Sequence, residues 1–168
     1  MADRLADLLD RDAVAVQLNA STAEDVIRRL ASKLEANGHV RSTYSQAAID
    51  REKTYPTGLP LGLAANVAVP HTDPVHVVSP AIALATLARP VDFANMEDPD
   101  ETVPVGVVFM LAINDKDRQI DTLQEVMALI QNPDAINDLL SADNVDDVLA
   151  VLEGRKKSSA AKDDDDDE

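Results

Sequence analysis

The chain of 168 residues has no cysteine and no tryptophan, and aromatic residues make up only 2% of it. The lack of cysteine excludes disulfide bonds, thiolate zinc sites and cysteine nucleophiles. Because aromatic residues are so few, the 45% of hydrophobic residues must build a core almost entirely from Ala, Val, Leu and Ile. A chain of this length can bury such a core in one domain of ordinary size.

Long apolar runs and positive charge are also scarce. No apolar run approaches the length of a membrane span, and the N-terminal stretch MADRLADLLDRDA is charged throughout, unlike a secretion signal. Acidic residues outnumber basic ones by 31 to 15, which gives a net charge of −16. Such a surface repels nucleic acids and anionic membranes, so we expect a cytoplasmic protein with no nucleic-acid partner and no direct membrane insertion.

Lysine is rare as well, with six in the chain. An acidic, lysine-poor surface is either a solubility feature or an adaptation to a high-salt cytoplasm, and we favour the second interpretation. The final residues, 154–168, are polar, low in complexity and end in the run DDDDDE. This composition predicts a disordered acidic tail that follows a domain spanning residues 1–153.

Apolar segments alternate with amphipathic ones along the domain. Four segments read as strands, and the last two are apolar on both faces, which is typical of a sheet covered by helices: 12–21, 66–70, 81–88 and 103–113. Five segments read as helices: 21–38, 42–55, 117–132, 132–142 and 144–154. The pattern predicts an α/β fold, a single layered domain with a mixed β-sheet flanked by helices.

Two of these helices carry more specific signals. Ser21, followed three residues later by Glu24, resembles a capping box and predicts the start of the first helix. The helix over 117–132 has one apolar face, which we expect to be buried: Ile120, Leu123, Val126, Met127 and Ile130.

Two of the three histidines lie in the short segment VAVPHTDPVH. His71, Asp73 and His76 are metal ligands in type, but on an extended segment His76 points away unless Pro74 turns the chain. No second cluster completes a ligand set, so we expect no metal. His71 could simply cap a strand. Its place after a buried strand, where α/β folds hold ligands, favours a neutral imidazole that acts as a nucleophile toward phosphorus.

The segment REKTYPTG, which precedes this strand, offers groups suited to a phosphoryl group. Arg51 supplies a guanidinium, and Thr57 supplies a hydroxyl beside Gly58. Arg51 could also form a surface ion pair, and Thr57 with Gly58 could simply make a turn. No Walker-type loop or kinase motif is present, so we expect no nucleotide and no other cofactor.

The order of Arg-Glu, Thr-Gly and strand-Pro-His, in the stretch DREKTYPTGLPLGLAANVAVPHTDPVHVV, resembles a known family. It is similar to the enzyme IIA domain of the fructose–mannitol class of the phosphoenolpyruvate-dependent sugar phosphotransferase system. The longer form, YPTGLP with VAVPHTD and HV, looks closest to the galactitol-type branch. The stretch VVFMLAINDKDRQIDTLQEVMALIQN also resembles that branch, and the likeness runs from about Ala13 to Leu152.

The resemblance implies a phosphotransferase component that carries a phosphoryl group on a histidine. It would accept the group from the carrier protein HPr and pass it to enzyme IIB, whose partner IIC transports the sugar. Fructose is the first expectation for that sugar and galactitol the second. The alternative is a regulatory IIA-like module that acts by phosphorylation-dependent protein binding. The oligomeric state stays open.

The resemblance also assigns roles to residues. His71 would be the nucleophile and carrier, while Arg51, Thr57 and the backbone of Gly58 would contact the phosphate. Asp73 would either hold the tautomer of His71 or cap the turn that follows it.

Many mannitol and fructose relatives carry another histidine near the start of the helix that follows the long strand. Here Asp117 or Arg118 occupies that neighbourhood, so His76 is the candidate for a second imidazole. Glu52 follows Arg51 in the family pattern and could be only a helix-end charge. His39, after a glycine, is expected to be a solvated loop residue.

Overall fold

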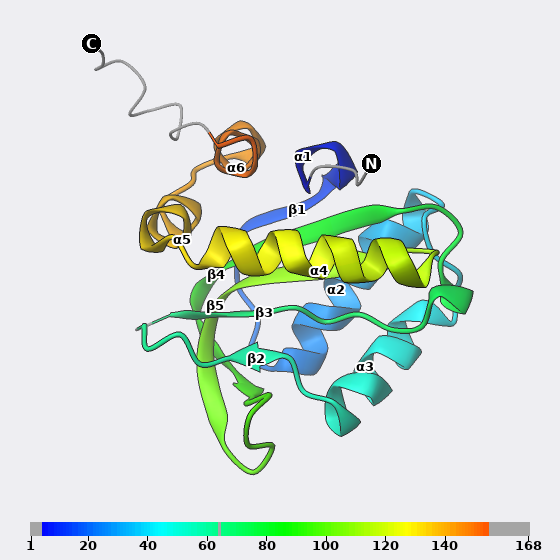
Figure 1. Cartoon of the computed structure of the whole chain (residues 1–168), viewed down its shortest axis with the longest axis horizontal. Helices are drawn as coiled ribbons and strands as arrows, with labels where there is room; N and C mark the ends of the chain where they lie inside the picture. Colours follow the sequence, from blue (N-terminus) through cyan, green and yellow to red (C-terminus); the bar gives the residue numbers. More distant parts are fainter. Residues whose placement is uncertain (1–4, 64, 155–168) are drawn as a thin grey trace.

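The computed structural model describes residues 5–63 and 65–154 (Figure 1). Five strands form one sheet in the order β1-β4-β5-β3-β2. Their bounds are β1 (Leu9–Leu18), β2 (Gly58–Leu59), β3 (Asn66–Ala68), β4 (Ala81–Ala94) and β5 (Thr102–Ala112). The β1–β4 and β3–β5 pairs are parallel, whereas the β2–β3 and β4–β5 pairs are antiparallel, so the predicted mixed sheet is confirmed.

Helices cover both faces of the sheet. They are α1 (Leu5–Leu8), α2 (Ala23–Ala36), α3 (Tyr44–Thr54), the 3-10 helix η1 (Pro74–His76), α4 (Lys116–Ile130), α5 (Pro133–Leu140) and α6 (Val145–Leu152). Buried side chains of α2 and α3 pack on one face, and those of α1, α4, α5 and α6 pack on the other. Figure 1 shows this arrangement, with α4 in front of the sheet and α2 behind it. The result is the predicted α/β domain.

Strand β4 shows why both faces had to be apolar. Ala81 and Ala83 contribute to the core on the α2 side, whereas Ile82 and Leu84 contribute to the core on the α4 side. Successive side chains of a strand point to opposite faces, so a strand between two helix layers buries both faces, as β4 does over residues 81–87. None of the described helices is long and apolar enough to cross a membrane.

The start of α2 differs from the expected capping box by one residue. Thr22, not Ser21, is the N-cap, and its hydroxyl accepts the N–H of Asp25 at 3.1 Å. Threonine and serine cap in the same way, because either hydroxyl can satisfy an unpaired N–H of the first turn.

The buried face of α4 is rotated from the expected one. Ile120 and Met127 are 50% and 39% exposed, whereas Gln119 and Thr122 are buried. The two polar side chains tolerate burial because they have partners. Gln119 Nε2 donates to the carbonyl of Thr72 at 3.1 Å, and the Thr122 hydroxyl donates to a backbone carbonyl one turn earlier at 2.7 Å. Two apolar side chains are thereby left on the surface.

Strand β4 is longer than the expected 81–88. It continues through Pro90 to Ala94, with a register shift against β5 between Thr86 and Val91. Such an irregularity lets a proline sit in a paired strand. The extension brings the β4–β5 hairpin, which turns over residues 95–101, against the short strand β2. The predicted tail lies, from residue 155 onward, outside the described residues.

Candidate functional site

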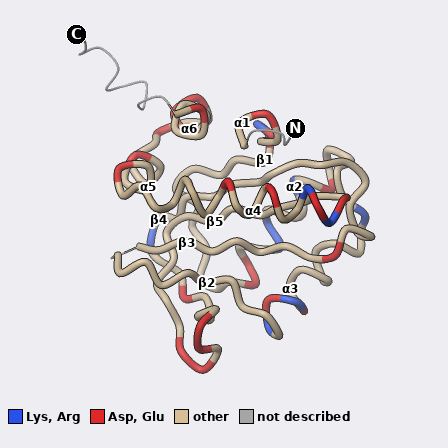
Figure 2. The backbone as a smooth tube through the Cα atoms, viewed as in Figure 1, with Lys and Arg blue, Asp and Glu red and all other residues tan. Residues whose placement is uncertain are grey.

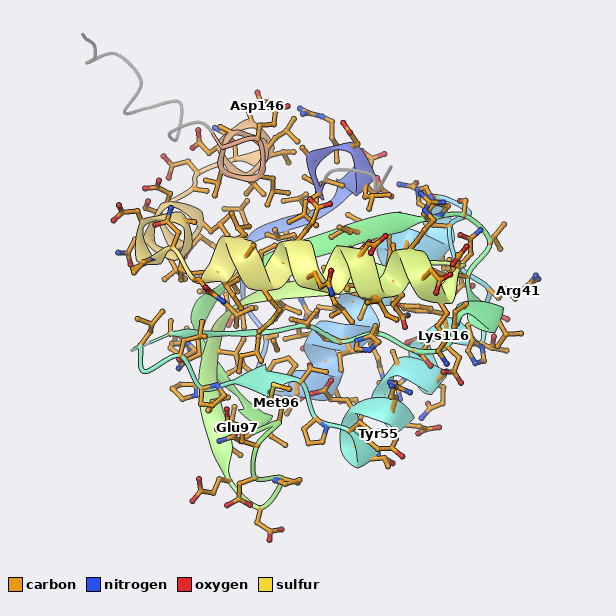
Figure 3. All side chains as sticks on the ribbon, in the orientation of Figure 1. Arg41, Tyr55, Met96, Glu97, Lys116 and Asp146 are labelled. Carbon is orange, nitrogen blue, oxygen red and sulfur yellow. The ribbon has the colours of Figure 1, made fainter. Side chains whose placement is uncertain are left out.

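Four segments of the chain meet around a cavity of about 210 Å³. The lining comes from the end of α3 with the loop after it, from the segment around β3, from α4 and from the β4–β5 hairpin. Its lining residues are Arg51, Tyr55, Pro56, Thr57, Leu59, Val69, His71, Met96, Leu123 and Met127. Figure 3 shows Tyr55 at the end of α3 and Met96 beside β2. The cavity therefore has an apolar lining with one histidine and one arginine.

His71 is held at this cavity by backbone contacts. The backbone just before it is tied to β5, because Leu111 N–H donates to the carbonyl of Pro70 at 3.1 Å. Its Nδ1 lies 2.8 Å from the carbonyl oxygen of Val69. A carbonyl can only accept, so Nδ1 carries the proton and Nε2 carries the lone pair. The ring is thus set to react through Nε2.

The surroundings of His71 also favour its neutral form. Burial lowers the pKa of His71 from its ordinary value of 6.5, and the positive charge of Arg51 acts in the same direction. The bond to Val69 and the charge of Asp73 raise the pKa, but they do not outweigh burial. A neutral imidazole at neutral pH is the nucleophilic form.

Arg51 lies in the last turn of α3 at the rim of the cavity. Its Nη1 is 3.7 Å from Oδ1 of Asp73, and its guanidinium lies 5.2 Å from the centroid of the Tyr55 ring. The ion pair is partly exposed to solvent, with side-chain exposures of 36% for Arg51 and 66% for Asp73. Arg51 is therefore the positive charge available at the mouth of the cavity.

Asp73 has a different partner from either of the two expected. The Nδ1 of His71 faces a backbone carbonyl rather than the Asp73 carboxylate. Asp73 is the N-cap residue of η1, but its side chain makes no capping hydrogen bond there. Its described partner is Arg51.

Thr57 is tied to Glu52, a residue that the sequence did not single out as structural. The Thr57 hydroxyl donates to Glu52 at 2.9 Å and accepts the N–H of Val69 at 3.1 Å, and the Thr57 N–H donates to Glu52 at 2.8 Å. Glu52 is buried, and burial raises its pKa while the two bonds from Thr57 lower it. In this conformation both donors of Thr57 are used by the buried carboxylate. The chain from Glu52 through Thr57 to Val69 ends at the residue whose carbonyl holds His71.

Gly58 allows the hairpin to close over the cavity. A Cβ at this position would lie 2.5 Å from the carbonyl oxygen of Ala94 and 2.7 Å from the side chain of Val103. The N–H of Met96 donates to the Gly58 carbonyl at 2.8 Å. Gly58 therefore places Met96 in the cavity wall, which gives this glycine a packing role.

His76, the candidate second imidazole, lies outside the residues that line the cavity. Its Nδ1 is 2.8 Å from the hydroxyl of Thr43. Asp117 is exposed at the start of α4. Near the start of this helix, Gln119 reaches the His71 segment through its bond to the carbonyl of Thr72.

His39 is not the solvated residue expected from the sequence. Its ring is half-buried, with Nδ1 2.9 Å from the Ser79 hydroxyl and Nε2 3.4 Å from Oδ2 of Asp10. Across residues 5–63 and 65–154, no group of three or more His, Asp and Glu side chains is arranged to hold a metal ion.

Comparison with known proteins agrees with this geometry. The family described as "Phosphoenolpyruvate-dependent sugar phosphotransferase system, EIIA 2" matches residues 7–154. The chain belongs to this family. It is therefore a phosphoryl-carrying EIIA component of the phosphotransferase system, as the motifs predicted.

Three proteins of known name or structure are similar to this EIIA chain. The galactitol-specific EIIA component of Escherichia coli K12 is 32% identical over 117 residues, covering 70% of this chain and 77% of that protein. The transcriptional regulator ManR of Bacillus subtilis is 30% identical over 142 residues, covering 83% of this chain and 20% of the regulator. Mannitol enzyme IIA from E. coli, solved in complex with phosphorylated enzyme IIB, matches with a TM-score of 0.71 and 26% identity, covering 88% of this chain and 98% of that one.

Proposed function

We propose that this EIIA component accepts a phosphoryl group on Nε2 of His71 from phospho-HPr and passes it to an enzyme IIB. The observation that carries the proposal is the bond between Nδ1 of His71 and the Val69 carbonyl, which leaves the Nε2 lone pair for the reaction. The Nε2–P bond forms as the P–N bond of the donor breaks. The proton stays on Nδ1, so the phosphorylated ring is a cation that leaves readily in the next transfer.

Arg51 is the residue that we propose to neutralise the phosphoryl oxygens. Transfer between two nitrogen atoms depends mainly on positioning and on charge neutralisation. Arg51 lines the same cavity as His71 and is partly exposed, so it can reach an incoming group. For Thr57 and the Gly58 backbone, direct phosphate contact remains a prediction. It would require Thr57 to exchange a bond that it now makes to Glu52.

For the sugar, the comparison favours galactitol over fructose. The galactitol-specific relative shares about a third of the matched residues with this chain. We therefore propose a galactitol-type pathway in which this cytoplasmic EIIA component serves an enzyme IIB and a membrane IIC. The solved complex of a relative with phosphorylated IIB supports IIB as a partner of this chain.

The test is phosphorylation with purified enzyme I, HPr and phosphoenolpyruvate, read as the intact mass of this protein. We expect a gain of one phosphoryl group that is labile in acid and stable in base. The His71→Ala variant should gain none, and the His76→Ala variant should still be labelled. Labelling of His71→Ala together with loss of labelling in His76→Ala would reject the assignment.

The second candidate is a regulatory module, favoured by the similarity to ManR. The two functions differ in the fate of the phosphoryl group. A transport component should lose it to a IIB protein within seconds to minutes, with the label moving to IIB. A regulatory module should keep it under the same conditions.

A further inference from the structure

Asp73 forms an ion pair with the arginine that the phosphoryl group would need. It lies two residues after His71, with its Oδ1 3.7 Å from Nη1 of Arg51. This distance is too long for a direct hydrogen bond, so the pair is a loose electrostatic contact. Both side chains are partly exposed, and such pairs add little to the stability of a fold. The position beside His71 suggests another role.

One cation at the site would have to serve two anions. Arg51 is the one lysine or arginine among the residues that line the described cavity. A phosphoryl group on His71 brings nearly two negative charges to the place where Asp73 already neutralises Arg51. The phosphoryl group and the Asp73 carboxylate would therefore repel each other and compete for the same guanidinium.

The charges of Arg51 and Asp73 already act on the ring in opposite directions. Arg51 lowers the pKa of His71, and Asp73 raises it. In the resting form the two charges act against each other at the cavity mouth. After phosphorylation this changes, because Asp73 then faces a dianion.

On the basis of the proposed function, we propose that Asp73 is a built-in competitor of the phosphoryl group. It neutralises Arg51 while His71 is empty and destabilises the phosphorylated form, so that the group is passed on rather than stored. Asp73 would thus set the phosphoryl-transfer potential of the protein without touching the reacting nitrogen.

The test is the equilibrium of phosphoryl exchange between phospho-HPr and this protein, measured at low ionic strength for three variants. The interaction between two exposed single charges changes an equilibrium constant by up to about fivefold. The phosphoryl group carries nearly two negative charges, so its repulsion from Asp73 should be stronger than that between two single charges. We therefore expect Asp73→Asn to shift the equilibrium about threefold to tenfold toward the phosphorylated protein. Asp73→Glu, which keeps the charge, should stay near wild type.

The matched control is Asp134→Asn, which makes the same change at an exposed position in the first turn of α5. It should leave the equilibrium unchanged. The shift in Asp73→Asn should shrink as salt is added, because screening weakens the repulsion. A purely structural role of Asp73 predicts neither the rescue by Glu nor the salt dependence.

An NMR titration of the His71 ring gives a second readout that needs no partner protein. The charged groups that act on this ring are Arg51, from α3, and Asp73, from the segment before η1. Asp73→Asn should lower the pKa of His71, and Asp73→Glu should restore it.

An exchange equilibrium for Asp73→Asn that equals wild type, or equals the shift in Asp134→Asn, would overturn the competitor role. So would an unchanged His71 titration. If wild-type protein takes up no phosphoryl group on His71 at all, the proposed function fails instead, and the titration alone then decides whether Asp73 acts on the ring.

Discussion

At the scale of single residues, the protonation of His71 is controlled by main-chain atoms. The Val69 carbonyl fixes which nitrogen carries the proton, and burial keeps the ring neutral. A backbone acceptor cannot titrate, so whenever the ring is neutral it holds the proton on the same nitrogen. Which nitrogen of the neutral ring keeps its lone pair therefore does not depend on a neighbouring acid.

The lowered pKa of His71 predicts the pH dependence of phosphoryl acceptance. The neutral ring is the nucleophile, and a lowered pKa keeps the ring neutral at a more acidic pH than usual. The rate of acceptance should therefore decline in acid with a midpoint below 6.5, the ordinary pKa of histidine. The measurement is an NMR titration of His71 together with transfer rates across that range. A midpoint at or above 6.5 would contradict the role assigned to burial.

Arg51 should act on transfer more than on stability. Arg51→Lys keeps the positive charge but loses the planar fork that can bind two phosphoryl oxygens, so transfer should slow by about tenfold. The melting temperature should change little, because lysine keeps the positive charge for the partly exposed ion pair with Asp73 and for the contact with the Tyr55 ring. A wild-type transfer rate in a folded Arg51→Lys protein would exclude a bidentate phosphate contact.

At the scale of elements, the geometry of the site depends on the hydrogen bonds that connect α3, β2 and β3. Glu52 ends the buried side of α3, and its two acceptor bonds fix the loop that leads into β2. Thr57 in turn receives the N–H of Val69, just after β3. The buried carboxylate therefore links the helix that carries Arg51 to the segment that carries His71.

Removing the hydroxyl of Thr57 tests this link. Thr57→Val has nearly the same shape but leaves the Val69 N–H without its acceptor and leaves Glu52 with the backbone N–H of residue 57 but without the hydroxyl donor. We expect a loss of about 1–3 kcal/mol in the free energy of unfolding, measured by urea denaturation. Thr57→Ser is the control, because it keeps the hydroxyl and should lose less than half as much. A larger loss in Thr57→Ser than in Thr57→Val would mean that packing of the methyl group, not the hydrogen bonds, matters here.

The elements with strong periodicity could be predicted from the sequence, and those that depend on distant contacts could not. The two long buried strands and the helices of the second half stand where the apolar pattern placed them. The buried face of α4 was misjudged because Gln119 and Thr122 find backbone partners that no local pattern reveals. The extension of β4 was missed because a proline ordinarily ends a strand.

The site residues, like the elements, could be predicted where the local sequence is informative and not where distant contacts decide. His71 and Arg51 carry recognisable chemistry, and the structure places both at one cavity. Glu52 was noted beside Arg51, but its buried bonds to Thr57 could not be predicted, because a glutamate at a helix end looks like a surface charge in sequence. Met96 and Met127 come from elements far from the motif, so only the fold brings them to the cavity.

At the scale of the whole molecule, acidic residues are spread widely over the surface. Figure 2 shows them at the tip of the β4–β5 hairpin and on the helices α5 and α6. The chain carries a net charge of −16, and like charges on a compact body oppose folding. We propose that this charge is an adaptation to high salt.

That proposal predicts that stability rises with potassium chloride into the molar range. Screening shortens the reach of charge repulsion from about 10 Å at 0.1 M to about 3 Å at 1 M. The melting temperature should therefore increase with salt, while an uncharged solute at equal osmolality should give a smaller rise. A melting temperature that is flat or falls with salt would rule the adaptation out.

The most direct test of the whole account is the identity of the phosphorylated atom. Protein labelled with nitrogen-15 in its histidines and phosphorylated through HPr should show, by NMR, a phosphorus–nitrogen coupling to Nε2 of His71. Nδ1 of the same ring should keep its proton, held by the Val69 carbonyl. A phosphoryl group found on Nδ1 of His71, or on His39 or His76, would contradict the account.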